Sequence, residues 1–546
     1  MSSQPEQPDT PAPADSAPPT DTAPPLDEQA SAIRAGYTFE GESIEIGVLV
    51  ADDAPLPEVK VRLPLSMMNR HGLIAGATGT GKTKTLQLLT EQLSAAGVPV
   101  VAADVKGDLS GLATAGEGND KLTERTRKIG QTWQPTAFPS EFYALGGKGT
   151  GIPLRATISS FGPVLLSKVL GLNDTQESSL GLVFHYADQA GLPLLDLADL
   201  QALMQYLTSD EGKPELKNIG GLSTATAGVI LREITAFSAQ GADQFFGEPE
   251  FDTADLLRVH DDGRGVISLI ELPDLATQPA LFSTFLMWLL ADLFQDLPEV
   301  GDVDKPKLVF FFDEAHLLFA DASKAFLESI TQTVRLIRSK GVGVFFVTQT
   351  PKDVPDDVLA QLGSRVQHQL RAHTPNDAKA LKQTVQTFPT SPYDLAEVLT
   401  TLGIGEGIVT VMDPDGVPTP VAWTRMRAPE SLMSPSPKEK MEQLVQGSPL
   451  FPKYGEAVDR ESAREMLAKR LEQGAEQAAA EPDAGQADAG PGTGRRREED
   501  DEPRRRDKDE KSLFEKVSSN TMVRQIGRTA VREIMRGLFG TGRRRR

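Results

Sequence analysis

The chain has 546 residues, a formal net charge of −21 and no cysteine. The length allows two to four domains, and the absence of cysteine excludes disulfides and thiolate metal sites. The negative charge argues against attraction of nucleic acid to the whole surface, but it does not exclude a basic channel or tail. The six histidines show no pair at ligand spacing, so we do not expect a metal site built from protein ligands. No apolar run approaches the roughly 18 residues of a membrane span, and the N-terminus lacks the features of a signal peptide. We therefore expect a cytoplasmic protein.

The N-terminal 36 residues are rich in Pro, Ala, Asp and Thr and contain almost no large apolar side chains. A segment of this composition cannot bury enough surface to offset its conformational entropy, so we predict that residues 1–36 are disordered. Alternating apolar residues follow at 43–50 and 58–65, and this pattern predicts a small β-hairpin.

From residue 73 to about 426, short apolar runs alternate with longer helical stretches, which is the pattern of an α/β sheet. Several runs are apolar throughout, as expected for strands that helices cover on both faces. A mostly helical stretch at about 163–262 is predicted to be an insertion into this sheet. The predicted strands are 72–76, 98–104, 265–272, 307–313, 342–349, 365–371 and 407–413.

The segment "GATGTGKT" has the spacing of a phosphate-binding P-loop and lies between an apolar run and a helical one. Its glycines allow backbone N–H groups to surround phosphate oxygens, and the helix start adds the positive end of its dipole. Lys82 is expected to reach the β- and γ-phosphates and Thr83 to offer its hydroxyl to Mg²⁺. A Gly-rich turn without a ligand is much less favoured, because of the Gly-Lys-Thr ending. The predicted nucleotide contacts are Gly76, Ala77, Thr78, Gly79, Thr80, Gly81, Lys82, Thr83 and Thr85.

The run "KLVFFFDEAH" is an apolar strand that ends in two acids, the Walker B pattern that a P-loop requires elsewhere in its sheet. Asp313 is predicted to hold Mg²⁺ through water, and Glu314 to polarise the attacking water. Two adjacent acids at a buried strand end are costly unless a cation or a reaction requires them, and the alternative is a pair of helix N-caps. An enzyme with both acids is expected to hydrolyse its nucleotide rather than only bind it.

Two further strands are predicted to end in polar residues at the same edge of the sheet. The run 342–349 ends in Thr348 and Gln349, which can sense the γ-phosphate and orient water, although a simple strand-terminating turn is the alternative. The run 98–104 ends in Asp104, which either adds to the Mg²⁺ shell, contacts a polymer substrate or caps the loop that follows.

Arginines matter because many ring ATPases complete a site with a guanidinium from the neighbouring subunit, worth roughly 10³–10⁵ in rate. Arg335 and Arg338 lie on a predicted helix, and Arg365 and Arg371 flank the predicted strand 365–371. Any of the four is also consistent with a plain surface charge. We favour Arg365, with Arg371 second.

The letters Asp-Glu-Ala-His also name a class of RNA helicases, but the rest of the chain argues against that class. Those helicases carry two RecA-like domains and a Ser-Ala-Thr motif, whereas the next strand here ends in Thr-Gln-Thr and no second α/β domain follows residue 426. We therefore interpret His316 as incidental. Because no Asn-Lys-x-Asp guanine signature occurs, the expected nucleotide is ATP, with Mg²⁺.

Taken together, these segments closely resemble a bacterial branch of the HerA-like ATPases, within the HerA/FtsK superfamily of ring-forming P-loop motors. The resemblance covers roughly residues 37–426 and the terminal helix, and it rests on "HGLIAGATGTGKT", "DVKGDLSGL", "FFGEPEFDTADLL", "KPKLVFFFDEAHLLF", "VRLIRSKGVGVFFVTQ" and "GSRVQHQLRAHTP". It implies a RecA-like fold and a hexameric ring around DNA, with ATP at the subunit boundaries. By this resemblance, the nucleotide-site residues are Lys82, Thr83, Asp313, Glu314 and Gln349. The candidates for the arginine finger and the sensor are Arg365 and Arg371.

The chain departs from this family at its N-terminal side. HerA proteins begin with a β-barrel domain that organises the ring and docks a nuclease. Too few residues precede Gly76 for such a barrel, so we do not expect a nuclease partner, and the inference of DNA pumping becomes weaker with it. The helical insertion is an alternative platform for partners.

The C-terminal part is predicted to contain a charged linker and a terminal helix. Residues 427–510 drift towards Glu, Ala, Gln and Gly and end in mixed charge blocks, which predicts a solvated linker. Residues 511–546 hold ten Lys or Arg and two acids. Arg524, Arg528, Arg532 and Arg536 recur every four residues, so this segment is predicted to be a basic amphipathic helix. Such a helix binds nucleic acid, an anionic membrane surface or its own ring, or packs its apolar face on the core.

The sequence thus leads to two hypotheses of different classes. The favoured one is a homohexameric ATPase whose hydrolysis drives movement on DNA or its remodelling. The alternative is a regulatory NTPase whose nucleotide state controls a protein partner without translocation. The link to DNA rests on family analogy.

Overall fold

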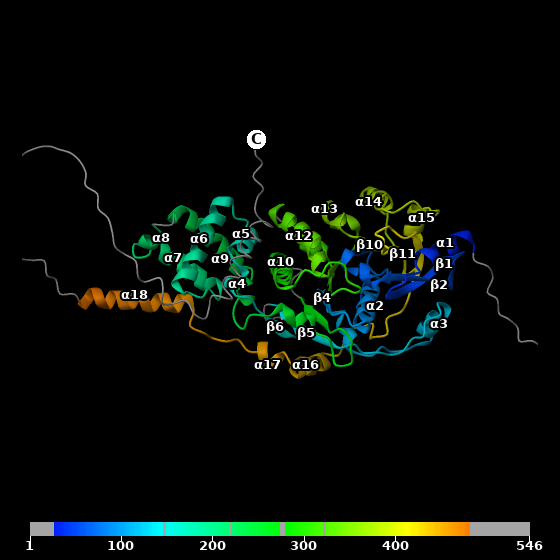
Figure 1. Cartoon of the computed structure of the whole chain (residues 1–546), viewed down its shortest axis with the longest axis horizontal. Helices are drawn as coiled ribbons and strands as arrows, with labels where there is room; N and C mark the ends of the chain where they lie inside the picture. Colours follow the sequence, from blue (N-terminus) through cyan, green and yellow to red (C-terminus); the bar gives the residue numbers. More distant parts are fainter. Residues whose placement is uncertain (1–26, 146–148, 218–219, 273–278, 320–323, 481–546) are drawn as a thin grey trace, which may run out of the picture.

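The structure is a computed structural model that describes residues 27–145, 149–217, 220–272, 279–319 and 324–480. Its strands form one twelve-stranded sheet in the order β2-β1-β12-β11-β10-β3-β9-β8-β4-β7-β5-β6. A group of helices lies at one end of this sheet and the β1–β2 hairpin at the other (Figure 1). The strands are β1 (Ser43–Ala51), β2 (Ala54–Pro64), β3 (Gly72–Ala75), β4 (Val100–Asp104), β5 (Ser140–Leu145), β6 (Ile152–Leu154), β7 (Ile267–Glu271), β8 (Leu308–Phe312), β9 (Val342–Thr348), β10 (Ser364–Gln367), β11 (Glu406–Thr410) and β12 (Ala422–Met426).

The eight strands from β10 to β6 run parallel. Within them, β9 lies between β3, which leads into the P-loop, and β8, which leads into the two acids. Because parallel strands end at the same edge, the P-loop and the acids emerge together, one strand apart. All seven predicted strands occur in the sheet, which confirms the RecA-like α/β fold; β5, β6 and β12 were not predicted.

The other end of the sheet is antiparallel. The predicted hairpin is confirmed as β1 and β2, which pair antiparallel. Strand β12 joins this hairpin to β11, and β11 pairs antiparallel with β10. The P-loop strand therefore lies inside the sheet, with neighbours on both sides.

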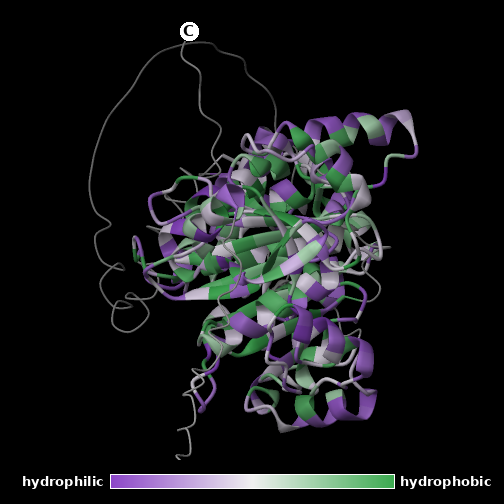
Figure 2. Cartoon of the chain, turned by 90° about the vertical axis from the view of Figure 1, so that its right-hand side faces the viewer, coloured by the Kyte–Doolittle hydropathy of each residue, from purple (hydrophilic) through white to green (hydrophobic). Residues whose placement is uncertain are grey.

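The apolar strands form the core, as the continuous hydrophobic runs require. Phe310, Phe311 and Phe312 of β8 are fully buried, and the rings of Phe312 and Phe346 stack at 5.5 Å. Figure 2 shows hydrophobic residues concentrated on the central strands and hydrophilic residues on the outer helices. This packing places the end of β8 on a rigid support.

The predicted helical insertion is confirmed, since α5 to α9 lie within residues 163–262. Side-chain caps explain where these helices begin: Asn173 and Asp196 form capping boxes with Gln176 and Asp199. None of the helices that the structure describes combines the length and apolar character of a membrane span. The helices are α1 (Glu28–Gly36), α2 (Lys82–Ala95), α3 (Asp120–Lys128), α4 (Ile158–Phe161), α5 (Pro163–Val169), α6 (Asp174–Ala190), α7 (Leu197–Thr208), α8 (Lys213–Leu216), α9 (Thr224–Ala239), α10 (Pro279–Asp296), α11 (His316–Phe319), α12 (Lys324–Ile337), α13 (Asp356–Leu359), α14 (Pro375–Val385), α15 (Leu395–Thr401), α16 (Lys438–Gly447), α17 (Phe451–Tyr454) and α18 (Ala463–Ala480).

The prediction of disorder up to residue 36 is wrong for residues 28–36, which form α1. Asp27 caps this helix by accepting a hydrogen bond from the backbone of Ala30 at 2.6 Å. Ile33 and Tyr37 are buried against the sheet, so a few apolar residues are enough to dock the helix. Residues 1–26 lie outside the described part.

The prediction that the core ends at residue 426 and a solvated linker follows is also wrong. Residues 428–436, which we call the covering segment, lie along the P-loop helix α2. Lys84 donates to the carbonyl of Met433 at 2.7 Å, and Gln87 to that of Leu432 at 2.9 Å. The carboxylate of Glu91 accepts from the backbone of Glu430 and of Ser431, each at 2.9 Å, and burial raises its pKa to about 7.

The chain continues in defined structure through α16, α17 and α18, and α18 packs on α7 of the insertion. The backbone N–H of Arg464 donates to Asp199 at 3.0 Å. Met441, Val445 and Tyr454 belong to the main hydrophobic core, but they are widely spaced among polar residues, so the composition of this part resembles that of a linker. The rest of the predicted linker and the basic helix at 511–546 lie outside the described residues.

Candidate nucleotide site

The loop 76–81 joins β3 to α2 and has the backbone that phosphate binding requires. Gly79 and Gly81 have φ values of 84° and 118°, which residues with a side chain rarely adopt. Lys82 begins α2, and its ammonium donates to the carbonyl of Ala77 across the loop at 3.2 Å. Partial burial lowers the pKa of Lys82, although the charge of Glu314 opposes this. The ammonium of Lys82 therefore lies beside the loop, where the prediction requires it for phosphate binding.

The loop is fixed to both neighbouring strands. The backbone N–H of Gly76 donates to Thr348 at the end of β9 at 3.2 Å, and that of Ala77 to Gln369 after β10 at 2.8 Å. Thr80 closes the loop with a 2.7 Å hydrogen bond to the carbonyl of Ala77. Hydrogen bonds within the chain therefore fix the shape of the phosphate loop.

A buried histidine supports the loop from below, and the sequence analysis did not identify it. Nδ1 of His368 lies 2.7 Å from the carbonyl of Glu406, and Nε2 lies 2.9 Å from the hydroxyl of Thr85. Because a carbonyl only accepts, Nδ1 carries the proton and Nε2 accepts from Thr85. Complete burial lowers the pKa of His368 to about 4, so the ring is neutral. The hydroxyl of Thr85, predicted to contact nucleotide, is turned to this ring instead.

The turn at 403–405 forms a second support. The N–H of Gly405 donates to the carbonyl of Thr80 at 3.0 Å. Arg125 on α3 holds this turn, since its guanidinium donates to the carbonyls of Gly405 at 2.9 Å and Met426 at 3.1 Å. No sequence motif marks Arg125, because these partners are backbone carbonyls about 280 and 300 positions away.

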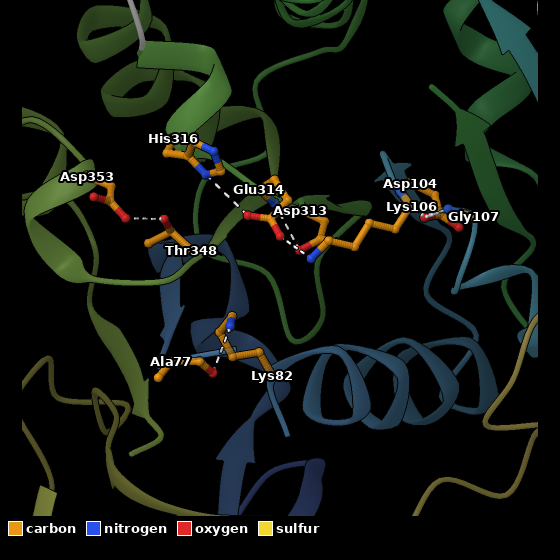
Figure 3. Close-up of polar contacts among 10 residues, drawn as sticks. All are labelled: Ala77, Lys82, Asp104, Lys106, Gly107, Asp313, Glu314, His316, Thr348 and Asp353. Atoms are coloured by element: carbon orange, nitrogen blue, oxygen red, sulfur yellow. Dashed lines mark hydrogen bonds and ion pairs between the residues drawn. The ribbon is translucent and has the colours of Figure 1, made fainter. Parts of the chain in front are cut away.

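Asp313 and Glu314 follow β8 directly, as predicted, and Figure 3 shows them facing Lys82 and Lys106. Asp313 is 3 % exposed, and burial followed by the charge of Glu314 raises its pKa to about 7. Its Oδ1 accepts from the N–H of Glu314 at 2.9 Å, whereas its Oδ2 is buried without a hydrogen-bond partner among the described residues. A buried carboxylate oxygen of this kind fits a divalent cation.

Glu314 adopts a left-handed backbone conformation with φ 49°, which costs a non-glycine residue on the order of 1–2 kcal/mol. One carboxylate oxygen contacts the ammonium of Lys106, which lies in the loop after β4. The other lies 3.2 Å from Nδ1 of His316. Partial burial would lower the pKa of Lys106, but its hydrogen bond with Glu314 and that carboxylate's charge raise it. The sequence analysis assigned no role to Lys106 and treated His316 as incidental, yet both lie against Glu314.

Of the alternatives considered for Asp104, the structure shows the loop cap. Its carboxylate accepts from the backbone of Lys106 at 3.2 Å, Gly107 at 2.7 Å and Leu109 at 2.9 Å. Burial raises its pKa to about 6. The aspartate shapes the loop that carries Lys106.

The polar end of β9 lies at the same edge. Thr348 donates its hydroxyl to Asp353 at 2.8 Å, and the same carboxylate oxygen accepts from the backbone of Thr350 at 3.1 Å. This arrangement fixes the turn after β9 and leaves the side chain of Gln349 exposed. The role predicted for Gln349 stays a prediction.

The four arginines are placed differently. Arg371 donates to the carbonyl of Thr78 in the P-loop at 3.2 Å, so it lies at its own chain's site. Arg365 is level with Leu73, at the other end of β10, and donates to the carbonyl of Thr387 at 3.2 Å. Arg335 is exposed on α12, and Arg338 lies 3.9 Å from Asp302. Their predicted roles towards a neighbouring subunit stay predictions.

Comparison with known proteins gives consistent matches. The family described as "Helicase HerA-like C-terminal" matches residues 51–546. The DNA double-strand break repair helicase HerA of Saccharolobus solfataricus is 23% identical over 388 residues, covering 70% of this chain and 68% of that protein. The HerA of Sulfurisphaera tokodaii is 22% identical over 383 residues, covering 68% and 67%. Among solved structures, the bacterial conjugative coupling protein TrwB aligns with a TM-score of 0.49 and 14% identity, over 75% of this chain and 94% of that one.

Proposed function

The chain belongs to the family of HerA-like helicase C-terminal domains, and from this premise we propose that it hydrolyses ATP at the P-loop and uses the energy to translocate on DNA or remodel it. The observation that carries the proposal is the placement of Lys82 and the pair Asp313 and Glu314 at one sheet edge, one strand apart. A phosphate loop alone binds nucleotide. The adjacent acids add the groups that Mg²⁺ binding and water activation need.

Each residue has a defined part in the proposed reaction. The loop N–H groups and Lys82 bind the phosphates and neutralise charge that develops on them. Thr83 and Asp313 would hold Mg²⁺, which would supply positive charge to the phosphates. The Oδ2 of Asp313, buried without a hydrogen-bond partner among the described residues, supports this assignment. Glu314 orients the attacking water and accepts its proton, and Gln349 senses the γ-phosphate from the end of β9.

We further propose that ATP lies at subunit boundaries of a ring, by analogy with the family. Arg371 contacts its own P-loop, which supports a sensor role within the same chain. Arg365 lies at the end of β10 remote from its own P-loop, which supports a role as the finger towards a neighbour's site. The names of the HerA relatives, as DNA double-strand break repair helicases, support DNA as the polymer.

A regulatory NTPase without translocation is the second candidate. The net charge of −21 disfavours a broad nucleic-acid surface, and the insertion with α18 offers a separate helical unit for a protein partner. Nucleotide state would then control that partner. This candidate predicts hydrolysis that is indifferent to DNA.

The first test is the steady-state ATPase rate with and without duplex and single-stranded DNA, at low and near-physiological salt. We expect stimulation by DNA that weakens with salt, since phosphate contacts release counterions. Glu314→Gln should lower kcat by about 10²-fold or more and retain bound ATP. The control Glu328→Gln changes an exposed acid on α12 that pairs with Lys324. Unchanged hydrolysis in Glu314→Gln would refute the assigned base, and DNA-independent hydrolysis would favour the regulatory NTPase.

A further inference from the structure

Lys106 is the cationic group that contacts the proposed catalytic base, and it belongs to neither the P-loop nor the Walker B strand. Its side chain is 49% exposed, whereas that of Glu314 is 7% exposed. Figure 3 shows the side chain of Lys106 reaching Glu314 from the loop after β4, and the difference in exposure places the ammonium nearer to solvent than the carboxylate. An anion arriving from solvent meets Lys106 before it meets Glu314.

The two carboxylate oxygens of Glu314 differ in this state. Oε1 contacts the ammonium of Lys106, whereas Oε2 lies 3.2 Å from Nδ1 of His316 and has no hydrogen-bond partner among the described residues. A general base must direct a free lone pair at the water that it activates. The ammonium of Lys106 occupies a lone pair of Oε1, so this arrangement opposes the approach of a water to that oxygen.

The loop that carries Lys106 is fixed, while the lysine side chain is long and half-exposed. Asp104 accepts three backbone hydrogen bonds from this loop, including those of Lys106 and Gly107. The backbone is thereby held beside Glu314. A change of side-chain rotamer is enough to move the ammonium, because the four-carbon side chain of lysine is flexible.

We propose that Lys106 is a positioning residue that holds Glu314 inactive, and that a backbone phosphate of bound nucleic acid draws it away and frees the base. The inference rests on the proposed function and adds to it a coupling between polymer binding and hydrolysis. A phosphate oxygen competes well with a carboxylate for a lysine, since both form charge-assisted hydrogen bonds. In a chain of net charge −21, such local cations are where a polyanion gains attraction.

The first experiment compares wild type, Lys106→Ala and Lys106→Arg by steady-state ATPase kinetics with and without duplex DNA. Lys106→Ala should raise the kcat measured without DNA by roughly two- to fivefold and leave KM unchanged. This fold-change corresponds to the interaction free energy of a partly exposed ion pair. DNA should then stimulate Lys106→Ala little or not at all. Lys106→Arg should restore low basal turnover and stimulation, because arginine keeps the charge. Lys128→Ala is the control, since Lys128 also forms an ion pair, with Glu124 on α3.

Two kinetic outcomes overturn the proposal. A fall in kcat or a rise in KM in Lys106→Ala would mean that Lys106 serves the nucleotide phosphates directly. Undiminished DNA stimulation in that variant would mean that nucleic acid does not act through Lys106. Hydrolysis that persists in Glu314→Gln concerns the proposed function instead, because it removes Glu314 as the base.

The second experiment needs no hydrolysis. Amine labelling of the full chain, read by mass spectrometry, should modify Lys106 roughly two- to fivefold faster in Glu314→Gln than in wild type, because the ion pair protects the ammonium. Lys128 should label equally in both proteins. Equal labelling of Lys106 in the two proteins overturns the proposal, whatever the ATPase assay gives.

Discussion

The phosphate loop and the acidic end of β8 lie one strand apart at the same sheet edge, but they are held differently. The loop is supported by backbone groups, the neutral ring of His368 and the turn at Gly405. The acidic end carries a strained Glu314 and a buried Asp313 oxygen without a partner in the described chain. The loop is held by hydrogen bonds within the chain, whereas the acidic end keeps a buried oxygen without a partner among the described residues, as the proposed Mg²⁺ site requires.

The largest expected effect follows from removing the cation of the phosphate loop. Lys82→Ala should lower kcat/KM for ATP by at least about 10²-fold, because the lysine stabilises charge that grows on the phosphates. The fold should persist, since backbone contacts hold the loop. ATPase kinetics and circular dichroism check both parts. A variant that keeps near wild-type turnover contradicts the placement of the site.

Asp313→Asn should separate activity from stability. Loss of the proposed contact of Asp313 with Mg²⁺ should lower kcat by about 10²-fold. The pKa of Asp313 is about 7 in the fold and 3.8 ordinarily, so between these values the native state binds more protons than the unfolded state. In the absence of Mg²⁺, the free energy of unfolding of the wild type should therefore decrease as pH rises from about 4 to 7. Asp313→Asn should not show this decrease. Thermal unfolding in a chelator across this range tests it; an equal slope in both proteins speaks against it.

His368 should show the opposite pH dependence. Its pKa is about 4 in the fold and 6.5 ordinarily, so the unfolded state binds more protons between these values. Stability should fall as pH drops from 6.5 to 4, and His368→Asn should reduce that slope by one proton. At neutral pH the variant should lose about 1–3 kcal/mol, because Thr85 loses its acceptor. Buried His71, whose pKa is also about 4, stays in both proteins as an internal reference.

The smallest of these effects is expected at the support under the loop. Arg125→Ala should cost about 1 kcal/mol of stability and raise KM for ATP a few-fold, because the turn at Gly405 loses its hydrogen bonds. Arg127→Ala on the same helix is the matched control, since its side chain is exposed. Equal denaturation midpoints and KM values for the two variants would show that the turn needs no such support.

The sequence predicted the parts of the fold that depend on local pattern. Continuous apolar runs predicted seven strands, and the P-loop and Walker B patterns predicted the residues that the fold brings to one sheet edge. Strands β6 and β12 were missed because one is three residues long and the other carries Trp423 and Arg425 at half-buried positions. Short or amphipathic strands resemble loops in composition.

The groups that support the site were missed for a different reason. Arg125, His368 and the covering segment contact groups that lie far away in the sequence, and no spacing rule encodes such contacts. Lys106 was visible in the sequence, but only the fold shows that its loop reaches Glu314. The sequence therefore predicted the groups proposed to contact the ligand better than the groups that hold those side chains in place.

The covering segment has a consequence for how the protein is made. Gln87 on the P-loop helix and Ser431 are hydrogen-bonded across 344 positions. During translation, α2 leaves the ribosome long before the segment that satisfies its buried Gln87 and Glu91. The hydrogen bonds of the P-loop helix are therefore completed only after most of the chain has been synthesised. A nascent chain that stops before residue 428 contains the P-loop sequence without the covering segment that packs on its helix.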